Sequence, residues 1–277
     1  MAETGGHSST GLQAVSADSE RMVDPSKAPG SHLARRHENR VLASLPPADL
    51  ALIARHLHIV SLQPGAILQH QDHPLDYVWF PHEGLVSLLA VTPEGETVEA
   101  ASVGRGGAVC PVLKSDVRDG FLTAVGQGAM RVSRIAAAQL QTVQKESEAL
   151  TRVLRACREA LLLQLRQNLV CGGLHAAEQR LSRWLLDAAD RLELDVFPIL
   201  ATQEQVAQRL GVRRTTVTLL ASKLQDAGAI RWGRSRVEIV DRARLESMAC
   251  GCYATLRERM SALLPADPAA PAKGLGG

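Results

Sequence analysis

The stretch TQEQVAQRLGVRRTTVTLLASKLQD, residues 202–226, predicts two short helices joined by a tight turn and decides the fold of the C-terminal part of the chain. Thr202 and Gln205 have the spacing of a capping box, in which the two side chains satisfy free backbone N–H groups at a helix start. Gly211 permits the backbone conformation that a sharp turn requires. The second helix has apolar residues at helical spacing, including Val217 and Leu224. We therefore expect a helix-turn-helix.

The second helix of this pair carries hydroxyl and basic side chains away from its apolar stripe. Arg pairs bidentately with guanine and Thr contacts bases or phosphates, so this face suits the major groove of DNA. An ordinary helical hairpin with a solvated polar face is the alternative. With the hairpin that follows, the expected DNA contacts are Thr202, Gln203, Arg213, Arg214, Thr215, Thr216, Thr218, Ser222, Lys223, Arg234, Ser235 and Arg236.

A β-hairpin with a basic tip follows this pair of helices. Residues 229–232 and 236–240 are predicted strands, and Gly-Arg-Ser at 233–235 is the predicted turn. Between Arg209 and Arg244 there are nine basic and three acidic residues, whereas the net charge of the whole chain is only +2. Positive charge is thus concentrated where phosphates would be bound. The hairpin is predicted to be the wing of a winged helix-turn-helix, and the absence of Cys and His from this window excludes a zinc finger there.

The composition indicates a soluble protein of two domains. The 277 residues are 45% hydrophobic and 22% charged, without an apolar run long enough for a membrane span and without a signal-peptide pattern at the N-terminus. Five cysteines, an odd number, favour reduced thiols in the cytoplasm. Residues 1–31 are predicted to be a disordered arm, and residues 254–277 a C-terminal tail.

The sequence pattern of the N-terminal half is first typical of helices and then typical of short strands. Short helices are expected at 37–45 and from Pro47 onward. Regular short strands with Gly and Pro turns then indicate an antiparallel sandwich, roll or barrel, which either encloses a small-molecule pocket or packs on itself. The expected strands are 59–62, 66–70, 77–81, 84–92, 97–103, 121–125 and 129–135.

The longest predicted helix spans 147–171. Residues at alternating spacings of three and four form the seam of a two-stranded coiled coil, in which Asn168 would fix the register. A helix that packs within a monomer is the alternative. Gly172 and Gly173 are predicted to form a hinge into a helix at 175–192, and a last helix is expected at 242–248. The expected homodimer contacts are Leu154, Cys157, Leu161, Gln164 and Asn168.

This order of elements resembles the cyclic-AMP receptor/Fnr (Crp/Fnr) superfamily of bacterial transcription regulators. The stretches that carry the resemblance are EQRLSRWLLDAADRL (178–192), LATQEQVAQRLGVRRTTVTLLASKLQDAGAI (200–230) and VEIVDRARLESMAC (237–250). The resemblance covers roughly Arg36 to Tyr253. It implies an α+β fold with a cyclic-nucleotide-binding-like β-roll at 32–146, a dimerisation helix at 147–172 and a winged helix-turn-helix domain at 173–253.

The stretches FPHEGLVSLL (80–89) and TVEAASVGRGGAV (97–109) resemble a subgroup whose sensor domain has diverged from the cyclic-AMP binders. Nucleotide-binding members present Gly-Glu to the ribose and Arg-Ser or Arg-Thr to the cyclic phosphate. Here the matching run after Gly106 lacks a Glu, and the second place contains Asp119-Gly120-Phe121. A cyclic phosphate needs a paired cation, so cyclic AMP is not the expected effector. The residues expected to bind an unidentified effector are Glu99, Arg105, Gly106, Gly107, Arg118, Leu165 and Arg166.

The reading helix departs from the family as well. Members often show Ser-Arg-Glu-Thr-Val where this chain has Arg213-Arg214-Thr215-Thr216-Val217, so the guanine-reading Arg maps onto Arg214 and the operator sequence is expected to differ. The cysteines do not form the N-terminal cluster that holds an iron–sulfur centre in Fnr-like members, so no such centre is expected.

Two further groups of residues are of types that can bind a metal ion. Cys250 and Cys252 are expected to be a thiol pair without ligand partners, with a redox switch as the alternative. His56, His58, His70 and His73 are expected to be solvated rather than the ligands of a cupin-type enzyme. No metal site and no enzymatic activity are expected.

Three hypotheses follow. The first is a dimeric transcription regulator that reads a pseudo-palindromic operator and is controlled by an effector at the β-roll, with double-stranded DNA and RNA polymerase as partners. The second is a DNA-binding dimer whose β-roll is only a scaffold. The third is a metal-dependent enzyme fused to a DNA-binding domain. Metal analysis tests the third, and effector-dependent DNA affinity distinguishes the first two.

Overall fold

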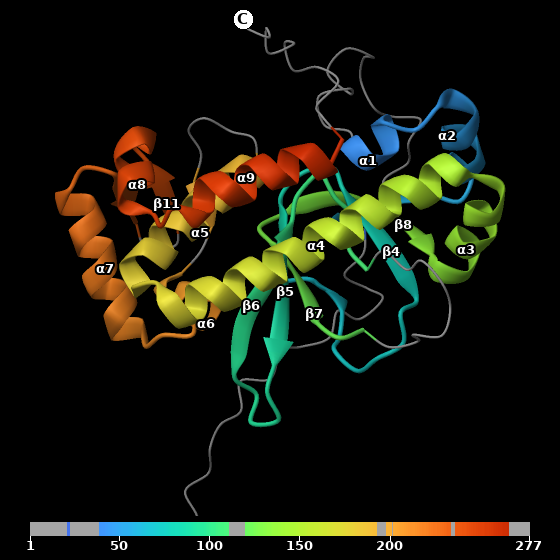
Figure 1. The fold of residues 1–277 in the computed structure, drawn as a ribbon. Helices are drawn as coiled ribbons and strands as arrows, with labels where there is room; N and C mark the ends of the chain where they lie inside the picture. The colour runs from blue at the N-terminus through green and yellow to red at the C-terminus, as the bar shows by residue number, and fades with distance from the viewer. Residues whose placement is uncertain are drawn as a thin grey trace, which may run out of the picture.

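The computed structural model describes residues 21–22, 39–110, 120–192, 198–200, 202–233 and 236–265. Figure 1 shows a β-roll crossed by one long helix, with a smaller, mainly helical domain at one end of that helix. The predicted α+β fold class is confirmed. None of the helices in the described ranges is long and apolar enough to cross a membrane.

Two four-stranded antiparallel sheets face one another in the β-roll. The first has the order β1 (Arg21–Met22), β2 (His58–Leu62), β8 (Met130–Ala136), β4 (Tyr77–Pro81); the second has the order β3 (Ile67–Gln69), β7 (Thr123–Gln127), β5 (Leu85–Val91), β6 (Thr97–Val103). The seven strands predicted between 59 and 135 are all present, with bounds that shift by up to two residues. Their inward side chains, among them Val60, Val86 and Val132, form one core between the sheets.

Short helices close the outer side of the first sheet. α1 (Arg40–Ala43) is capped by Asn39, whose side chain accepts from the N–H groups of Val41 and Leu42. α2 (Pro47–Ala54) begins at a proline, as predicted, and α3 (Ala137–Glu146), which was not predicted, follows β8. Their apolar residues form a second core with β4 and the long helix. The arm expected at 1–31 contributes β1, which pairs with β2, and its other residues lie outside the described ranges.

The long helix α4 spans Glu148–Leu174 and is capped by Ser147. The predicted hinge at Gly172 and Gly173 was wrong in position, because both glycines lie inside the last turn of α4. The helix ends only at His175, where the backbone becomes extended before α5 (Ala177–Leu192). The break therefore comes at His175, two residues after Gly173.

The C-terminal domain contains the predicted winged helix-turn-helix. α6 (Gln203–Leu210) and α7 (Arg214–Asp226) are followed by β10 (Ile230–Trp232), β11 (Arg236–Ile239) and α8 (Arg242–Met248). A strand that was not predicted, β9 (Pro198–Leu200), pairs with β11. The expectation of a tail from 254 onward was wrong, because α9 (Cys252–Leu263) buries Tyr253 and Leu256 and packs along α4 (Figure 1). The domain boundaries as such stay predictions.

Candidate nucleic-acid interface

Local sequence signals position α6 and α7. The capping box is present: the Thr202 hydroxyl accepts from the Gln205 N–H at 3.2 Å, and the Gln205 Oε1 accepts from the Thr202 N–H at 2.9 Å. Gly211 has φ +61°, the left-handed conformation that glycine adopts without strain. Because α6 stops there and α7 starts three residues later, the two helices can cross over a shared core.

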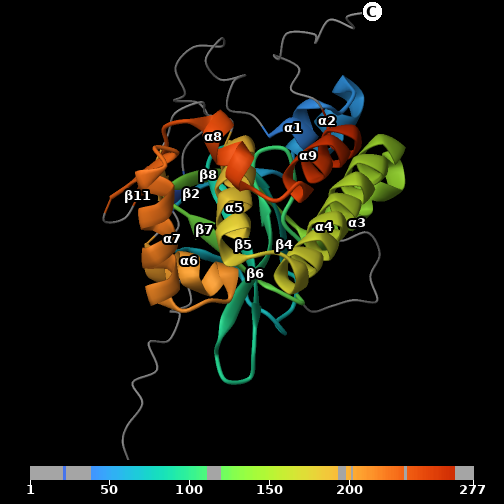
Figure 2. The same ribbon diagram turned by 60° about the vertical axis from the view of Figure 1, so that its left-hand side comes forward.

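That core fixes which face of α7 is outward. Val217, Leu220 and Leu224 are buried against the apolar stripe of α5, which includes Leu181 and Leu185. The opposite face is exposed and carries the predicted contacts Arg213, Arg214, Thr215, Thr218, Ser222 and Lys223, whereas Thr216 is half-buried. Both views place α7 at the outer edge of the domain, remote from the N-terminal half of α4 (Figure 2). The polar face of this helix is thus open to a large partner.

Some of the predicted contacts are already engaged within the chain. Thr218 Oγ1 donates to Gln203 Oε1 at 2.8 Å, and Lys223 Nζ lies 3.0 Å from Glu178 Oε2. The guanidinium groups of Arg213 and Arg214 have no hydrogen bond or ion pair in the described part of the chain, so both are free to contact a ligand. They lie at the start of α7, the end of a recognition helix that contacts base edges.

The wing is anchored to the end of α7. The Trp232 N–H donates to Gln225 Oε1 at 2.9 Å, and β10 pairs with β11 in the predicted hairpin. Arg236 is exposed on β11, and its guanidinium lies 3.9 Å from the Glu238 carboxylate. Arg234 and Ser235, the predicted tip, lie outside the described residues.

Not all the positive charge counted in this window faces outward. Arg209 is buried on α6 and pairs with Glu99, while Arg242 pairs with Asp190 and Glu246. The basic surface is therefore smaller than the sequence count indicated.

A buried polar network joins the β-roll to this domain. The Glu99 carboxylate on β6 accepts hydrogen bonds from Ser87 Oγ at 2.5 Å, Trp184 Nε1 at 2.9 Å and Arg209 Nε at 3.1 Å. Burial lowers the pKa of Arg209, although the Glu99 charge and hydrogen bond act in the opposite direction. The Arg209 guanidinium also stacks over the Trp184 ring, 5.3 Å from its centroid. The carboxylate thus ties α5 and α6 to the second sheet.

The residues expected to bind an effector are placed in different surroundings. Glu99 is occupied by this network. Gly107 accepts from the Asn39 side chain at 2.8 Å and Arg105 O accepts from the Arg40 N–H at 2.9 Å, so the turn that contains Gly106 packs against α1. Leu165 is half-buried and Arg166 exposed on α4. Arg118 lies outside the described residues.

The predicted dimer contacts lie mainly on the inward face of α4. Leu154, Cys157 and Gln164 are buried within the chain, and Leu161 is half-buried against the core of the roll. Gln164 Oε1 accepts from the Ser102 N–H at 3.1 Å, and Asn168 Nδ2 donates to Ala100 O at 2.8 Å. The predicted seam therefore packs on the protomer's own β-roll, and the exposed face of α4 instead presents Leu162, Leu169 and Val170.

A cluster of sulfur and nitrogen ligands lies where α4, α5 and α9 meet. The side chains are Cys171, His175, Cys250 and Cys252, whose potential ligand atoms all lie within 4.8 Å of one another. The expectation that Cys250 and Cys252 lack partners was wrong. The helical i, i+4 spacing of Cys171 and His175 was the one sequence signal that could have indicated a shared face. Among the described residues this is the only such group found, and His56, His58, His70 and His73 are not part of it.

The thiols differ in their surroundings. Burial raises the pKa of Cys110 and Cys157 to about 12. Burial also acts to raise the pKa of Cys171, but hydrogen bonds from Gln167 and His175 and the Arg183 charge outweigh it, so this pKa lies below its usual value.

Comparisons with known proteins agree with this architecture. Residues 179–248 match the Crp-like helix-turn-helix domain family. The chain is 28% identical over 127 residues to the nitrogen fixation regulation protein FixK of Bradyrhizobium diazoefficiens, a match that spans 44% of this chain and about half (54%) of that protein.

Solved structures share the fold. FixK2 from Bradyrhizobium japonicum superposes with a TM-score of 0.61 at 18% identity, over 70% of this chain and 98% of that one. The c-di-GMP responsive global regulator CLP of Xanthomonas campestris gives 0.59 at 14% identity, over 70% and 99%. A transcriptional regulator of the CRP/FNR family from Thermus thermophilus gives 0.57 at 22% identity, over 69% and 97%.

Proposed function

We propose that the chain is a Crp/Fnr-type transcription regulator that binds double-stranded DNA as a homodimer through α7 and the β10–β11 wing. The observation that carries this proposal is the outward face of α7, where Arg213 and Arg214 are exposed and unpaired among the described residues at the start of the helix. Guanidinium groups in this position reach guanine edges in the major groove. We propose that the protein acts in the cytoplasm and that RNA polymerase is a further partner.

The first experiment measures fluorescence anisotropy on the DNA upstream of the gene against a scrambled duplex, with and without cyclic AMP. We expect tight, sequence-preferring binding that cyclic AMP leaves unchanged. Binding that requires cyclic AMP would overturn the expectation about the effector, and binding without sequence preference would overturn the proposed function.

Arg214→Ala tests the reading helix. We expect a loss of about 1–3 kcal/mol at one base position of the operator, because a bidentate pair with guanine is removed. Arg236→Ala is the matched control, since a wing contact to phosphate weakens specific and random DNA alike. An equal loss on both duplexes for Arg214→Ala would contradict the role in base reading.

We propose that the dimer contact uses the outward stripe of α4. Leu162, Leu165 and Leu169 follow one another at spacings of three and four, and Leu169 is 78% exposed. We expect Leu169→Lys to shift the protein from dimer to monomer in sedimentation experiments, whereas Val240→Lys, at an exposed valine of the C-terminal domain, leaves the dimer intact. A dimer that survives Leu169→Lys unchanged would rule this face out.

The β-roll as a scaffold is the second candidate role. This role is favoured by the network around Glu99. Glu99 was predicted to bind an effector, but its carboxylate already accepts hydrogen bonds from Ser87, Trp184 and Arg209. DNA binding with full affinity and no response to any added nucleotide would support it.

A further inference from the structure

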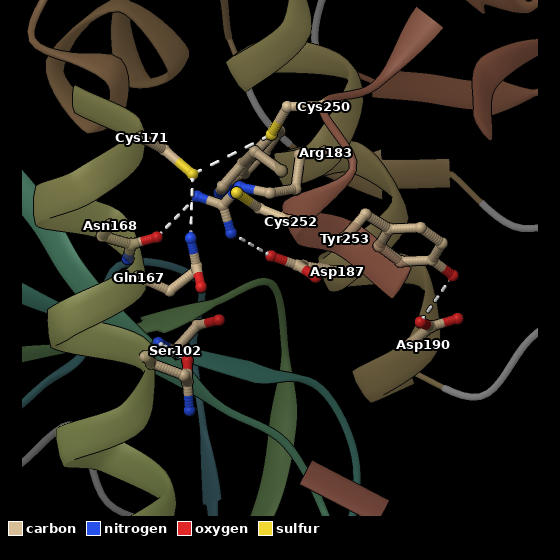
Figure 3. Close-up of polar contacts among 12 residues, drawn as sticks. Ser102, Gln167, Asn168, Cys171, Arg183, Asp187, Asp190, Cys250, Cys252 and Tyr253 are labelled. Atoms are coloured by element: carbon tan, nitrogen blue, oxygen red, sulfur yellow. Dashed lines mark hydrogen bonds and ion pairs between the residues drawn. The ribbon is translucent and has the colours of Figure 1, made fainter. Parts of the chain in front are cut away.

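Four potential metal ligands converge at the junction between the long helix and the DNA-binding domain. Cys171 lies in the last turn of α4 and His175 ends that helix, while Cys250 and Cys252 flank the start of α9. Cys171 Sγ is 3.9 Å from Cys250 Sγ, and Cys252 Sγ is 3.8 Å from His175 Nδ1. Figure 3 shows the three sulfur atoms turned toward one another.

These distances suit a tetrahedral ion. Two sulfurs bound at about 2.3 Å to one Zn²⁺ lie about 3.8 Å apart, close to the 3.9 Å between Cys171 Sγ and Cys250 Sγ. A sulfur at about 2.3 Å and a nitrogen at about 2.0 Å lie about 3.5 Å apart, slightly less than the 3.8 Å between Cys252 Sγ and His175 Nδ1. Three thiolates and one imidazole are a ligand set of structural zinc sites, which use all four positions. Thiolate and imidazole donors also select against Mg²⁺ and Ca²⁺, which prefer oxygen. We propose that Cys171, His175, Cys250 and Cys252 bind one Zn²⁺ ion.

The surroundings support a charged, ordered centre. Gln167 Nε2 donates to Cys171 Sγ at 3.5 Å, the kind of outer hydrogen bond that orients a metal ligand. Arg183 lies beside the sulfurs and is held by Asp187 at 2.6 Å and Asn168 at 2.5 Å (Figure 3). Zn²⁺ with three thiolates has a net charge of −1, which the Arg183 guanidinium would offset. On binding, the three thiols release their protons to solvent.

The ion would connect segments that are far apart in the sequence. Cys171 and Cys250 are separated by 79 residues, and the winged helix-turn-helix lies between them. The same junction is held on its far side by Tyr253, whose hydroxyl donates to Asp190 Oδ2 at 2.8 Å (Figure 3). A bound ion therefore fixes α9 to the end of α4, where the chain passes into α5. If the proposed DNA-binding function holds, the ion sets the orientation of that domain.

The test is metal analysis of the full-length protein, purified under reducing conditions and supplied with Zn²⁺. We expect one zinc per chain, and replacement by Co²⁺ should give the intense visible bands of a tetrahedral thiolate centre. Cys252→Ser and His175→Ala should lose zinc to a chelator that leaves the parent protein loaded; both positions are only partly buried, so the core is spared. Gln167→Ala should retain all four ligands but bind about 10- to 100-fold more weakly.

Cys110→Ser is the matched control, because Cys110 lies in the β-roll outside the cluster, and it should keep one zinc per chain. Circular dichroism verifies that each variant is folded. Removal of zinc should also accelerate cleavage by chymotrypsin after Leu174, which is exposed beside the cluster. The absence of zinc and of the cobalt bands from folded parent protein, or equal retention by Cys252→Ser, would overturn the proposal. A Cys171–Cys250 disulfide in the presence of reductant and Zn²⁺ would overturn it as well. None of these readouts uses DNA, so failure here is distinct from failure of the proposed function.

Discussion

The buried pair between Glu99 and Arg209 is the contact whose loss should most weaken the attachment of the DNA-binding domain to the β-roll. Both side chains are only 5% exposed, and Glu99 receives three hydrogen bonds from two parts of the molecule. Glu99→Gln keeps the shape but leaves the Arg209 guanidinium buried without its counter-charge. We expect a loss of about 3–5 kcal/mol in the free energy of unfolding, the usual cost of removing one partner of a buried ion pair.

A double-mutant cycle in urea tests this reasoning. Arg209→Met should also destabilise the protein, because it leaves a buried carboxylate without its cation. The double variant Glu99→Gln/Arg209→Met should lose less than the sum of the two single losses, by about 1–3 kcal/mol, since no charge is then left unpaired.

The control is Glu238→Gln, which removes the partner of Arg231. That guanidinium is 72% exposed, so the expected loss is about 0–1 kcal/mol. If Glu99→Gln costs no more than this control, or if the two single losses add to within about 0.5 kcal/mol, the network does not join the domains as argued.

Two further substitutions test the helix-turn-helix itself, each by thermal or urea unfolding. Gly211→Ala should cost about 1–2 kcal/mol, because φ +61° disfavours a side chain and the new Cβ would lie 3.2 Å from Val98 Cγ2; a stability equal to the parent would show that the turn relaxes. Thr202→Ala should cost about 1 kcal/mol by removing the cap of α6, whereas Thr202→Ser should be nearly neutral, and equal losses for both would contradict capping as the cause.

Local signals explain what was predictable from the sequence. The cap at Thr202, the turn at Gly211 and the alternation in the β-hairpin act within a few residues, so α6, α7 and the wing were expected close to their observed positions. Gly172 and Gly173 suggested a hinge because glycine is unfavourable inside a helix. In the folded chain α4 continues through them, since tertiary contacts to α9 hold the helix end.

Long-range contacts account for what was missed. Periodicity indicated an apolar stripe on α4, but it does not reveal which surface covers a stripe. The predicted dimer contacts, Leu154, Cys157, Leu161, Gln164 and Asn168, proved to pack against the chain's own N-terminal domain. Cys171 and Cys250 are brought together by the whole C-terminal domain, so no spacing rule joins them. The apolar residues of α9, among them Tyr253 and Leu256, do recur at helical intervals and could have been recognised.

The length of α4 turns a small rotation into a large displacement. A helix of 27 residues is about 40 Å long at a rise of about 1.5 Å per residue. A tilt of about 5° at its N-terminal end therefore moves its C-terminal end by about 3.5 Å, close to the 3.4 Å between successive base pairs. In the proposed dimer, each α4 ends at a DNA-binding domain. Such a tilt would therefore change the separation of the two DNA-binding domains by the rise of one or two base pairs.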